Sequence, residues 1–198
     1  MRHGIALQTA EALVEHLRPA CVRIEIAGSI RRLKPEVKDI EIVAIPDLSL
    51  KVTRAPLKFG EPIPELYKTA LDKALGEMKA LGDIQFEKAG ERYKKFYLKY
   101  AGISVDLFLV LPPATWGVQM LIRTGPADFS HWMVSRQKTG GALPNGYRVQ
   151  DGAVWIGEHE DKEIVDGHFV GFETEKEFLS FCGFDWIPPE EREAKWKR

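Results

Sequence analysis

The chain has 198 residues, of which 44% are hydrophobic, and this size suffices for one large domain or two small ones with a buried core. Its formal net charge of −1 provides no global basic surface, so nucleic acid can be bound only through local patches. Two cysteines exclude a disulfide scaffold and a cysteine zinc site, and no apolar run approaches the roughly 18 residues that span a bilayer, so we expect a cytoplasmic protein without a membrane partner.

The hydrophobic pattern of the first half predicts helices and strands in alternation. In chain order, we expect a helix over 5–18, a strand over 22–26, a short helical turn after Gly28 with Ser29 near its N-cap, and a strand over 40–45. A loop or irregular strand over 47–61 follows, then a helix over 64–81 and strands over 84–87, 94–100 and 104–110.

The pair Pro112-Pro113 predicts a domain boundary. After it we expect helices over 114–122 and 127–138, strands over 147–150 and 153–156 joined by a tight turn, and a helix over 174–181. The whole pattern predicts an α+β fold. A first domain over 1–112 would hold a mixed or antiparallel sheet with helices, and a smaller α/β domain would follow over 113–198.

Three carboxylates lie on two of the expected strands. Asp39 and Glu41 are two residues apart, so their side chains point to one face of a strand, while Ile40 and Ile42 point to the other face, into a core. Asp106 alternates with apolar residues in the later strand in the same way. If the two strands are neighbours in a sheet, the three acids converge.

Converging carboxylates repel one another and raise each other's pKa values unless cations neutralise them. Mg²⁺ prefers oxygen ligands and keeps several waters, so three carboxylates and substrate phosphates suit two Mg²⁺ ions, for which Mn²⁺ can substitute. Two such ions can activate an attacking hydroxyl and stabilise a leaving pyrophosphate. The alternative is that these acids simply face solvent at the edge of an amphipathic sheet.

The stretch Gly28-Ser29-Ile30-Arg31-Arg32 precedes the first acidic strand. A glycine lets the backbone come close to a phosphate, the serine offers a hydroxyl, and the amides at the start of a helix point outward. Arg32 is suited to hold a triphosphate oxygen. The alternative is an ordinary strand-to-helix turn with surface arginines.

Together these motifs resemble the nucleotidyltransferases of the DNA polymerase beta type, the family X DNA polymerases. That family has Gly-Ser-x-Arg-Arg, then Asp-x-Asp or Asp-x-Glu on the next strand, and a third Asp on a later strand. A Thr-Gly turn within 123–129 and a Trp-Ile-Pro-Pro stretch within 186–193 match the family as well. The resemblance implies a nucleotidyltransferase palm over 1–112 and a thumb, or nucleotide-selecting domain, over 113–198, in a minimal form without the family's lyase domain.

The resemblance also implies roles for individual residues. The residues that would bind the two metal ions and carry catalysis are Asp39, Glu41 and Asp106, the last of which would help to deprotonate the primer 3′-hydroxyl. The residues that would bind the triphosphate are Gly28, Ser29, Arg32, Lys38 and Arg2. The residues that would form the sugar and base pocket are Ile122, Arg123, Thr124, Gly125 and His131.

The chain departs from the family pattern at several places, and the positions of the family's Asn and Arg that touch the nascent base pair fall near Ser130 and Val134 here. The second acid is Glu41 rather than Asp, which moves one carboxylate outward by a methylene, and Lys38 stands where the family usually has a glycine. Ile122 and Arg123 replace an aromatic pair that helps the family to exclude ribonucleotides. The resemblance therefore leaves the choice of sugar open.

Basic and aromatic residues alternate just before the third acid, and the basic ones could contact nucleic-acid phosphates. Lys95 and Lys99 share one face of the expected strand, and Lys94 lies on the other. A solvated strand face is the alternative. Arg136, in the expected helix after the Thr-Gly turn, is a further candidate for nucleic-acid binding, and His131 could substitute for a family residue that touches the nascent base pair.

These observations predict a DNA-directed DNA polymerase that adds a dNMP from a dNTP to a primer 3′-hydroxyl. Its partner would be a DNA primer–template or a gapped duplex, in short gap filling or DNA repair, and it would act as a monomer. By resemblance to the family alone, the compact form without a lyase domain implies a phage or bacterial origin. Two alternatives remain: a nucleotidyltransferase that is template-independent or uses RNA or another acceptor, and a nucleic-acid-binding module without catalysis.

Overall fold

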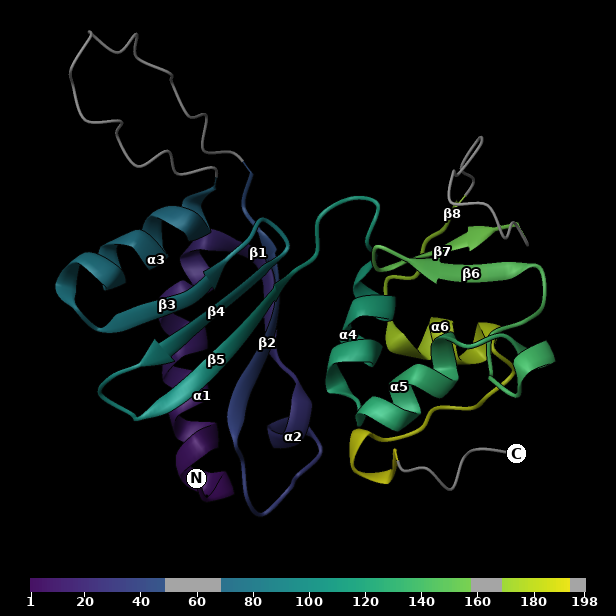
Figure 1. The fold of residues 1–198 in the computed structure, drawn as a ribbon, viewed down its shortest axis with the longest axis horizontal. Coiled ribbons are helices and arrows are strands. Elements are labelled where there is room, and N and C mark those ends of the chain that lie inside the picture. Colours follow the sequence, from purple (N-terminus) through teal and green to yellow (C-terminus); the bar gives the residue numbers. More distant parts are fainter. Residues whose placement is uncertain (49–68, 158–168, 193–198) are drawn as a thin grey trace, which may run out of the picture.

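The computed structural model describes residues 1–48, 69–157 and 169–192, and Figure 1 shows their arrangement. We use "N-terminal part" for the described residues up to 112 and "C-terminal part" for those from 113 to 192. The elements of the N-terminal part are α1 (His3–Leu17), η1 (Arg18–Ala20), β1 (Cys21–Ile26), α2 (Gly28–Arg31), β2 (Asp39–Pro46), α3 (Ala70–Leu81), β3 (Ile84–Ala89), β4 (Tyr93–Leu98) and β5 (Ile103–Leu109).

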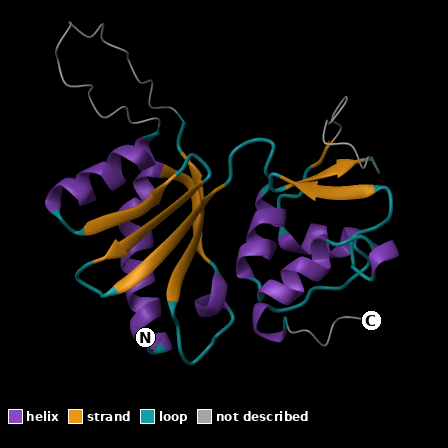
Figure 2. Cartoon of the chain, viewed as in Figure 1, coloured by secondary structure: helices purple, strands orange, loops and turns teal. Residues whose placement is uncertain are grey.

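The C-terminal part holds a second, smaller set of elements (Figure 2). They are α4 (Trp116–Thr124), α5 (Ala127–Val134), η2 (Gln137–Thr139), β6 (Tyr147–Gln150), β7 (Ala153–Ile156), β8 (Phe169–Val170), α6 (Glu175–Phe181) and η3 (Pro189–Glu191). The chain is therefore a mixed α+β protein, as predicted. None of the helices in the described ranges is long and apolar enough to cross a membrane.

Most predicted elements are confirmed to within a few residues, and three predictions need correction. The helix predicted over 64–81 begins at Ala70, because the Thr69 side chain caps its first turn by accepting a hydrogen bond from the Asp72 amide; residues 64–68 lie outside the described ranges, as do residues 49–61 of the predicted loop. The helix predicted over 127–138 ends at Val134, because Ser135 is extended and its carbonyl accepts a hydrogen bond from the Leu143 amide.

The third correction concerns α2. The N-cap of this short helix is Ala27, not Ser29, and no side chain caps it. Ser29 is the second residue of the helix, so its hydroxyl is not used for capping.

The N-terminal part is built on a five-stranded sheet with the order β1-β2-β5-β4-β3. The central pair, β2 and β5, is parallel, and the other neighbours are antiparallel. One face of the sheet packs against α1 and α3 (Figure 1). Because β2 and β5 are far apart in sequence and adjacent in space, the sheet brings the two acidic strands together.

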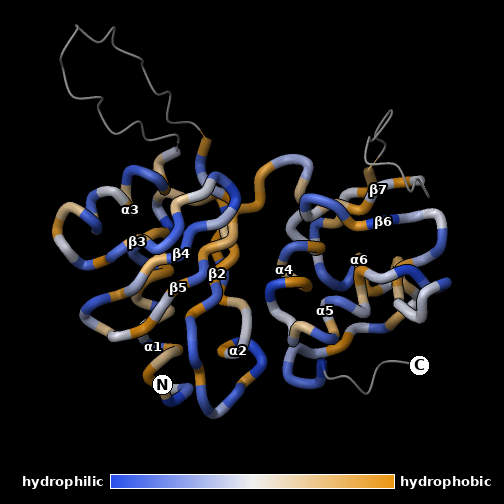
Figure 3. The backbone as a smooth tube through the Cα atoms, in the orientation of Figure 1, coloured by the Kyte–Doolittle hydropathy of each residue, from blue (hydrophilic) through white to orange (hydrophobic). Residues whose placement is uncertain are grey.

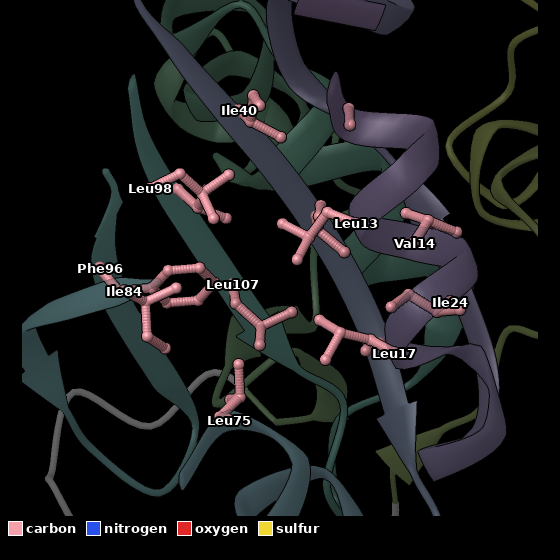
Figure 4. Close-up of a cluster of buried hydrophobic side chains, with 14 of the residues drawn as sticks. Leu13, Val14, Leu17, Ile24, Ile40, Leu75, Ile84, Phe96, Leu98 and Leu107 are labelled. Atoms are coloured by element: carbon pink, nitrogen blue, oxygen red, sulfur yellow. The ribbon is translucent and has the colours of Figure 1, made fainter. Parts of the chain in front are cut away.

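Alternation along the strands produces this packing. Every second residue of β5 is buried, and the residues between them are half-buried on the other face. Figure 4 shows the buried set converging between the sheet and the helices, with Leu13 and Leu17 from α1, Leu75 from α3 and Leu107 from β5. In Figure 3 the same alternation appears as apolar and polar colours that change along the strands.

The C-terminal part has a hydrophobic core of its own. Val118 and Leu121 of α4, Phe129 of α5 and Phe178 of α6 are fully or nearly fully buried together with Val154 of β7. The three-stranded antiparallel sheet has the order β6-β7-β8. The change from one core to the other falls near residues 110–116, close to the predicted boundary at Pro112-Pro113.

A third, small cluster joins the two parts. Trp116 and Met120 of α4 pack against Ala27, Val43 and Val110 of the N-terminal part. Val43 lies on the same face of β2 as Asp39 and Glu41, since it is two residues from Glu41. The C-terminal part therefore covers the sheet face that carries the acids at Val43, and Glu41 lies directly beside this contact on β2.

Candidate active site

The three acids lie on adjacent strands of one sheet face. In the parallel pair of β2 and β5, Glu41 stands opposite Asp106, and Asp39 stands opposite Ser104. The opposite face is rigidly packed, because Ile40 and Ile42 have no exposed surface. The condition under which the sequence predicted convergence, namely that the two strands are neighbours, is thus met.

The turn before the acids folds directly onto Glu41. The Ala27 amide donates a hydrogen bond of 2.8 Å to the Glu41 carbonyl, and Gly28 follows with a φ of 61°. A methyl group at Gly28 would overlap the Glu41 carboxylate. Glycine is therefore required here for two reasons, its left-handed backbone and the carboxylate against its Cα.

Burial gives Glu41 unusual electrostatics. Its pKa is raised from the usual 4.5 to about 7, first because burial disfavours the charged form and next because of the charge of Asp39. The Arg32 guanidinium and a hydrogen bond from the Ser29 backbone act in the opposite direction. A cation close to this carboxylate would remove most of the cost of its ionisation.

Two hydrogen-bond donors beside the acids are buried without an acceptor. Among the described residues, the Ser29 hydroxyl and the Arg32 Nε have no hydrogen-bond partner. Such unpaired buried donors are rare in folded proteins, because each leaves desolvation uncompensated. A phosphate group would satisfy both, since it accepts hydrogen bonds from hydroxyls and guanidinium groups alike.

The two arginines of the turn also tie the N-terminal part to the C-terminal part. Arg31 donates to the Thr124 hydroxyl at 2.6 Å and pairs with Glu175 at 2.5 Å. Arg32 donates through Nη1 to the Thr124 carbonyl. Burial lowers the pKa of Arg32, although the nearby Glu41 opposes that shift.

Thr124 and Gly125, predicted for the sugar pocket, lie at this junction. The Thr124 hydroxyl, fully buried, is occupied by Arg31, and a Cβ at Gly125 would lie 3.1 Å from the Arg32 guanidinium. The Thr124-Gly125 turn therefore packs directly against Arg32, one of the residues predicted to bind the triphosphate. Ile122, from the same predicted pocket, packs against the core of the C-terminal part.

The acidic residue of the C-terminal part that binds Arg31 was not identified from the sequence. Glu175, at the start of α6, pairs with Arg31 and, at 2.6 Å, with Arg192, whose side chain has no exposed surface. Arg192 belongs to the C-terminal stretch with Trp186 that the sequence singled out, but nothing in the pattern links it to Arg31. Two guanidinium groups thus share one buried carboxylate.

Arg123 lies over the ring of Phe108, with its guanidinium carbon 4.0 Å from the ring centroid. Its charge acts on Glu41, Tyr93 and Asp106, and burial lowers its pKa. Among the described residues its Nε has no hydrogen-bond partner. A cation that the sequence predicted for the sugar pocket therefore lies within electrostatic range of the acids.

A second residue that the sequence did not single out for this site is Tyr93 on β4. Its hydroxyl donates a hydrogen bond of 2.5 Å to Asp106 Oδ1. The strand register places it opposite Phe108, beside the third acid. The alternation of basic and aromatic residues in this strand was the available signal, but only the register links Tyr93 to Asp106.

The predicted basic contact with nucleic acid is corrected at Lys94. Its side chain is buried on the core face, where Nζ pairs with Asp72 at 2.7 Å, so it does not reach the face of the acids. Lys95 stands opposite Asp106 on the acidic face and pairs with Glu87 at 3.3 Å. Lys99 is exposed in the turn after β4.

The remaining predicted residues lie around the rim. Lys38 is exposed directly before Asp39, and Arg2 pairs through its backbone with Glu36 in the loop before β2. His131 is exposed on α5. Arg136 follows α5 and is half-buried, and its backbone forms a bridge with Leu143.

The donor set suits Mg²⁺, because the three side chains offer only carboxylate oxygens. In the part of the chain that the structure describes, no three acidic, histidine or cysteine side chains are gathered closely enough to enclose an ion. Glu41 is turned toward Gly28. Binding would therefore involve reorientation of the Glu41 side chain on a strand that is already in register with β5.

Comparison with known proteins adds no assignment. No protein-family model matches the chain, and no curated protein matches it either.

Proposed function

We propose that the chain is a metal-dependent nucleotidyltransferase of the DNA polymerase beta type. It would transfer a dNMP from a dNTP to the 3′-hydroxyl of a DNA primer in a gapped or primed duplex. In this assignment the N-terminal part is the nucleotidyltransferase palm, and the C-terminal part is the nucleotide-selecting domain. The observation that carries the proposal is the register of Glu41 opposite Asp106, with the Gly28-Ser29 turn folded onto the same carboxylate.

Each part of the site has a role in this reaction. Ser29 and Arg32 hold the triphosphate through their unused donors. Asp39, Glu41 and Asp106 would hold two Mg²⁺ ions, which would stabilise the charge of the attacking hydroxyl and of the leaving pyrophosphate. Asp106 also accepts the proton of the primer hydroxyl. Positioning and electrostatic stabilisation supply most of the catalysis, as in other phosphoryl transfers.

A second candidate is a nucleotidyltransferase of the same kind with a different sugar choice or acceptor. Arg123 supports it, because this cation lies at the position of the resemblance where an aromatic residue helps to exclude ribonucleotides, and its guanidinium lies over the Phe108 ring. A guanidinium beside the sugar can donate hydrogen bonds to a ribose 2′-hydroxyl, which an aromatic ring cannot do.

The test is primer extension on a duplex with a one-nucleotide gap, with Mg²⁺ or Mn²⁺ and with each dNTP and rNTP supplied separately. Asp106→Ala removes one proposed metal ligand. Ser104→Ala is the matched control, since it lies on the same face of β5, two residues away. Circular dichroism of both variants shows whether the fold is retained.

Extension by the complementary dNTP alone, lost in Asp106→Ala and retained in Ser104→Ala, is the expected result. Extension by rNTPs or without regard to the template would support the second candidate instead. Binding of a nucleoside triphosphate without any pyrophosphate release, with either metal, would overturn both and leave a nucleic-acid-binding module.

A further inference from the structure

The hydroxyl of Tyr93 is bound to one oxygen of the third acid. Tyr93 Oη donates to Asp106 Oδ1 at 2.5 Å, from the neighbouring antiparallel strand. The carboxylate is thereby fixed about its own bond to the chain, and Oδ2 is not part of this hydrogen bond.

The tyrosine ring is itself held in place. It stacks on Phe108 with ring centroids 5.1 Å apart and an angle of 18° between the planes. The Lys88 ammonium lies 5.6 Å from the ring centroid, and Arg123 lies over the neighbouring Phe108 ring. A cation therefore lies close to each of the two stacked rings, an arrangement that favours both contacts electrostatically.

This stack crosses from one part of the chain to the other. Arg123 belongs to α4, Phe108 to β5, Tyr93 to β4 and Lys88 to β3. The orientation of Asp106 is thus linked, through two rings, to a cation of the C-terminal part. No other hydrogen bond to the Asp106 carboxylate is found among the described residues, so Tyr93 determines its orientation.

We propose that Tyr93 is a positioning residue for Asp106, holding Oδ1 and leaving Oδ2 to the metal ion that the site would bind. This inference rests on the proposed function. Removing a residue that hydrogen-bonds to a metal-ligating side chain typically weakens metal affinity about 10- to 100-fold. Tyr93 does not touch the substrate or the ion, and its effect passes through Asp106.

The test uses Tyr93→Phe, which removes the hydroxyl and keeps the stacked ring. Tyr97→Phe is the matched control, because Tyr97 lies on the same face of the same strand and is 39% exposed. Mn²⁺ binding to the protein without nucleotide is followed by electron paramagnetic resonance, and single-nucleotide extension of a gapped duplex is measured in parallel. Asp106→Asn is titrated with Mn²⁺ in the same way.

We expect Tyr93→Phe to weaken Mn²⁺ binding about tenfold or more and to lower kcat with little change in KM for the dNTP, while Tyr97→Phe changes neither. Equal Mn²⁺ affinity in Tyr93→Phe and the wild type, with Asp106→Asn clearly weakened, would overturn the role of Tyr93 alone. An unchanged affinity in Asp106→Asn would instead overturn the metal site, and with it the proposed function. A loss of thermal stability in Tyr93→Phe without a change in Mn²⁺ affinity would show a structural role and also overturn the inference.

Discussion

Gly28 and Glu41 meet between α2 and β2, and each constrains the other. The backbone of Gly28 is left-handed, and its Cα lies against the Glu41 carboxylate, which is consequently desolvated. This contact explains the glycine of the motif, and it contributes to the burial that, with the charge of Asp39, raises the pKa of the acid. At the residue scale, the site is therefore a close approach of backbone to a buried carboxylate, flanked by unused donors on Ser29 and Arg32.

Gly28→Ala tests this contact. We expect it to lower the free energy of unfolding by about 2–4 kcal/mol, because the left-handed backbone and the overlap with Glu41 both cost energy. Gly140→Ala is the matched control, since Gly140 has a φ of 82° and no atom near its added Cβ. Urea denaturation measures both, and equal losses would show that the overlap with Glu41 contributes nothing.

The raised pKa of Glu41 makes a prediction about pH. The pKa is about 7 in the folded chain and 4.5 when unperturbed, so between these values the folded state binds more protons than the unfolded state. The contribution of Glu41 to the free energy of unfolding therefore falls as the pH rises from 4.5 to 7, by about 3 kcal/mol at most.

Glu41→Gln removes this titration and keeps the shape of the side chain. We expect the variant to be more stable than the wild type at pH 8 and to differ least from it near pH 4.5, in urea denaturation without added metal. A constant difference between the two proteins across this range would contradict the assignment of a raised pKa to Glu41.

At the scale of elements, alternation on β4 divides its lysines between two environments. Lys94 points to the core face, where α3 supplies Asp72, and Lys95 points to the acidic face beside Asp106. Lys94 thus joins α3 to the sheet through a largely buried ion pair with Asp72. Its Nζ also donates a hydrogen bond of 3.1 Å to the Gly90 carbonyl, in the turn between β3 and β4. Substitutions of Lys94 and of Lys95 should consequently affect stability and DNA binding differently.

We expect Lys94→Met to lower the free energy of unfolding by about 1–3 kcal/mol, because Asp72 is left partly buried without its cation. Lys95→Met should change stability by less than about 1 kcal/mol, since its ion pair with Glu87 is exposed to solvent. Under the proposed function, Lys95→Met should also reduce the salt dependence of DNA binding by about one phosphate contact.

Urea denaturation measures the free energy of unfolding of both variants, and fluorescence anisotropy of labelled DNA at several salt concentrations measures their DNA binding. A loss of DNA affinity in Lys94→Met at unchanged stability would contradict the placement of this lysine on the core face.

At the scale of the whole molecule, the two parts are joined by charge as well as by apolar packing. Glu175 accepts from Arg31 of the N-terminal part and from Arg192 near the end of the described chain. Breaking a buried pair by removing one partner typically costs about 3–5 kcal/mol, because an uncompensated charge remains. Trp116 and Met120 supply the apolar half of the same contact.

We expect Glu175→Ala to weaken the contact between the two parts by about 3–5 kcal/mol, since two guanidinium groups lose their shared carboxylate. The change should appear as faster limited proteolysis between residues 110 and 115 and as a broader, non-cooperative urea transition. Lys176→Ala, an exposed neighbour on the same helix, is the control. Wild-type proteolysis and a single transition at the wild-type midpoint in Glu175→Ala would contradict the role of this junction.

The local features of this protein could be predicted from its amino-acid sequence. Alternation placed Asp39 and Glu41 on one strand face with Ile40 and Ile42 on the other, and the buried and half-buried pattern of β2 confirms it. These features follow from rules that act over two to four residues, namely the strand and helix periods and the turn preferences of glycine and proline. Most element positions were predictable for the same reason.

Which distant segments meet could not be predicted from local patterns and is known from the three-dimensional fold. The pairing of β2 with β5 brings together residues more than sixty positions apart, and with it the register of Glu41 opposite Asp106. Alternation separated Lys94 from Lys95, but only the packing of α3 determined which of them faces the core. The bond from Tyr93 to Asp106 and the sharing of Glu175 are likewise long-range contacts, which no local periodicity encodes.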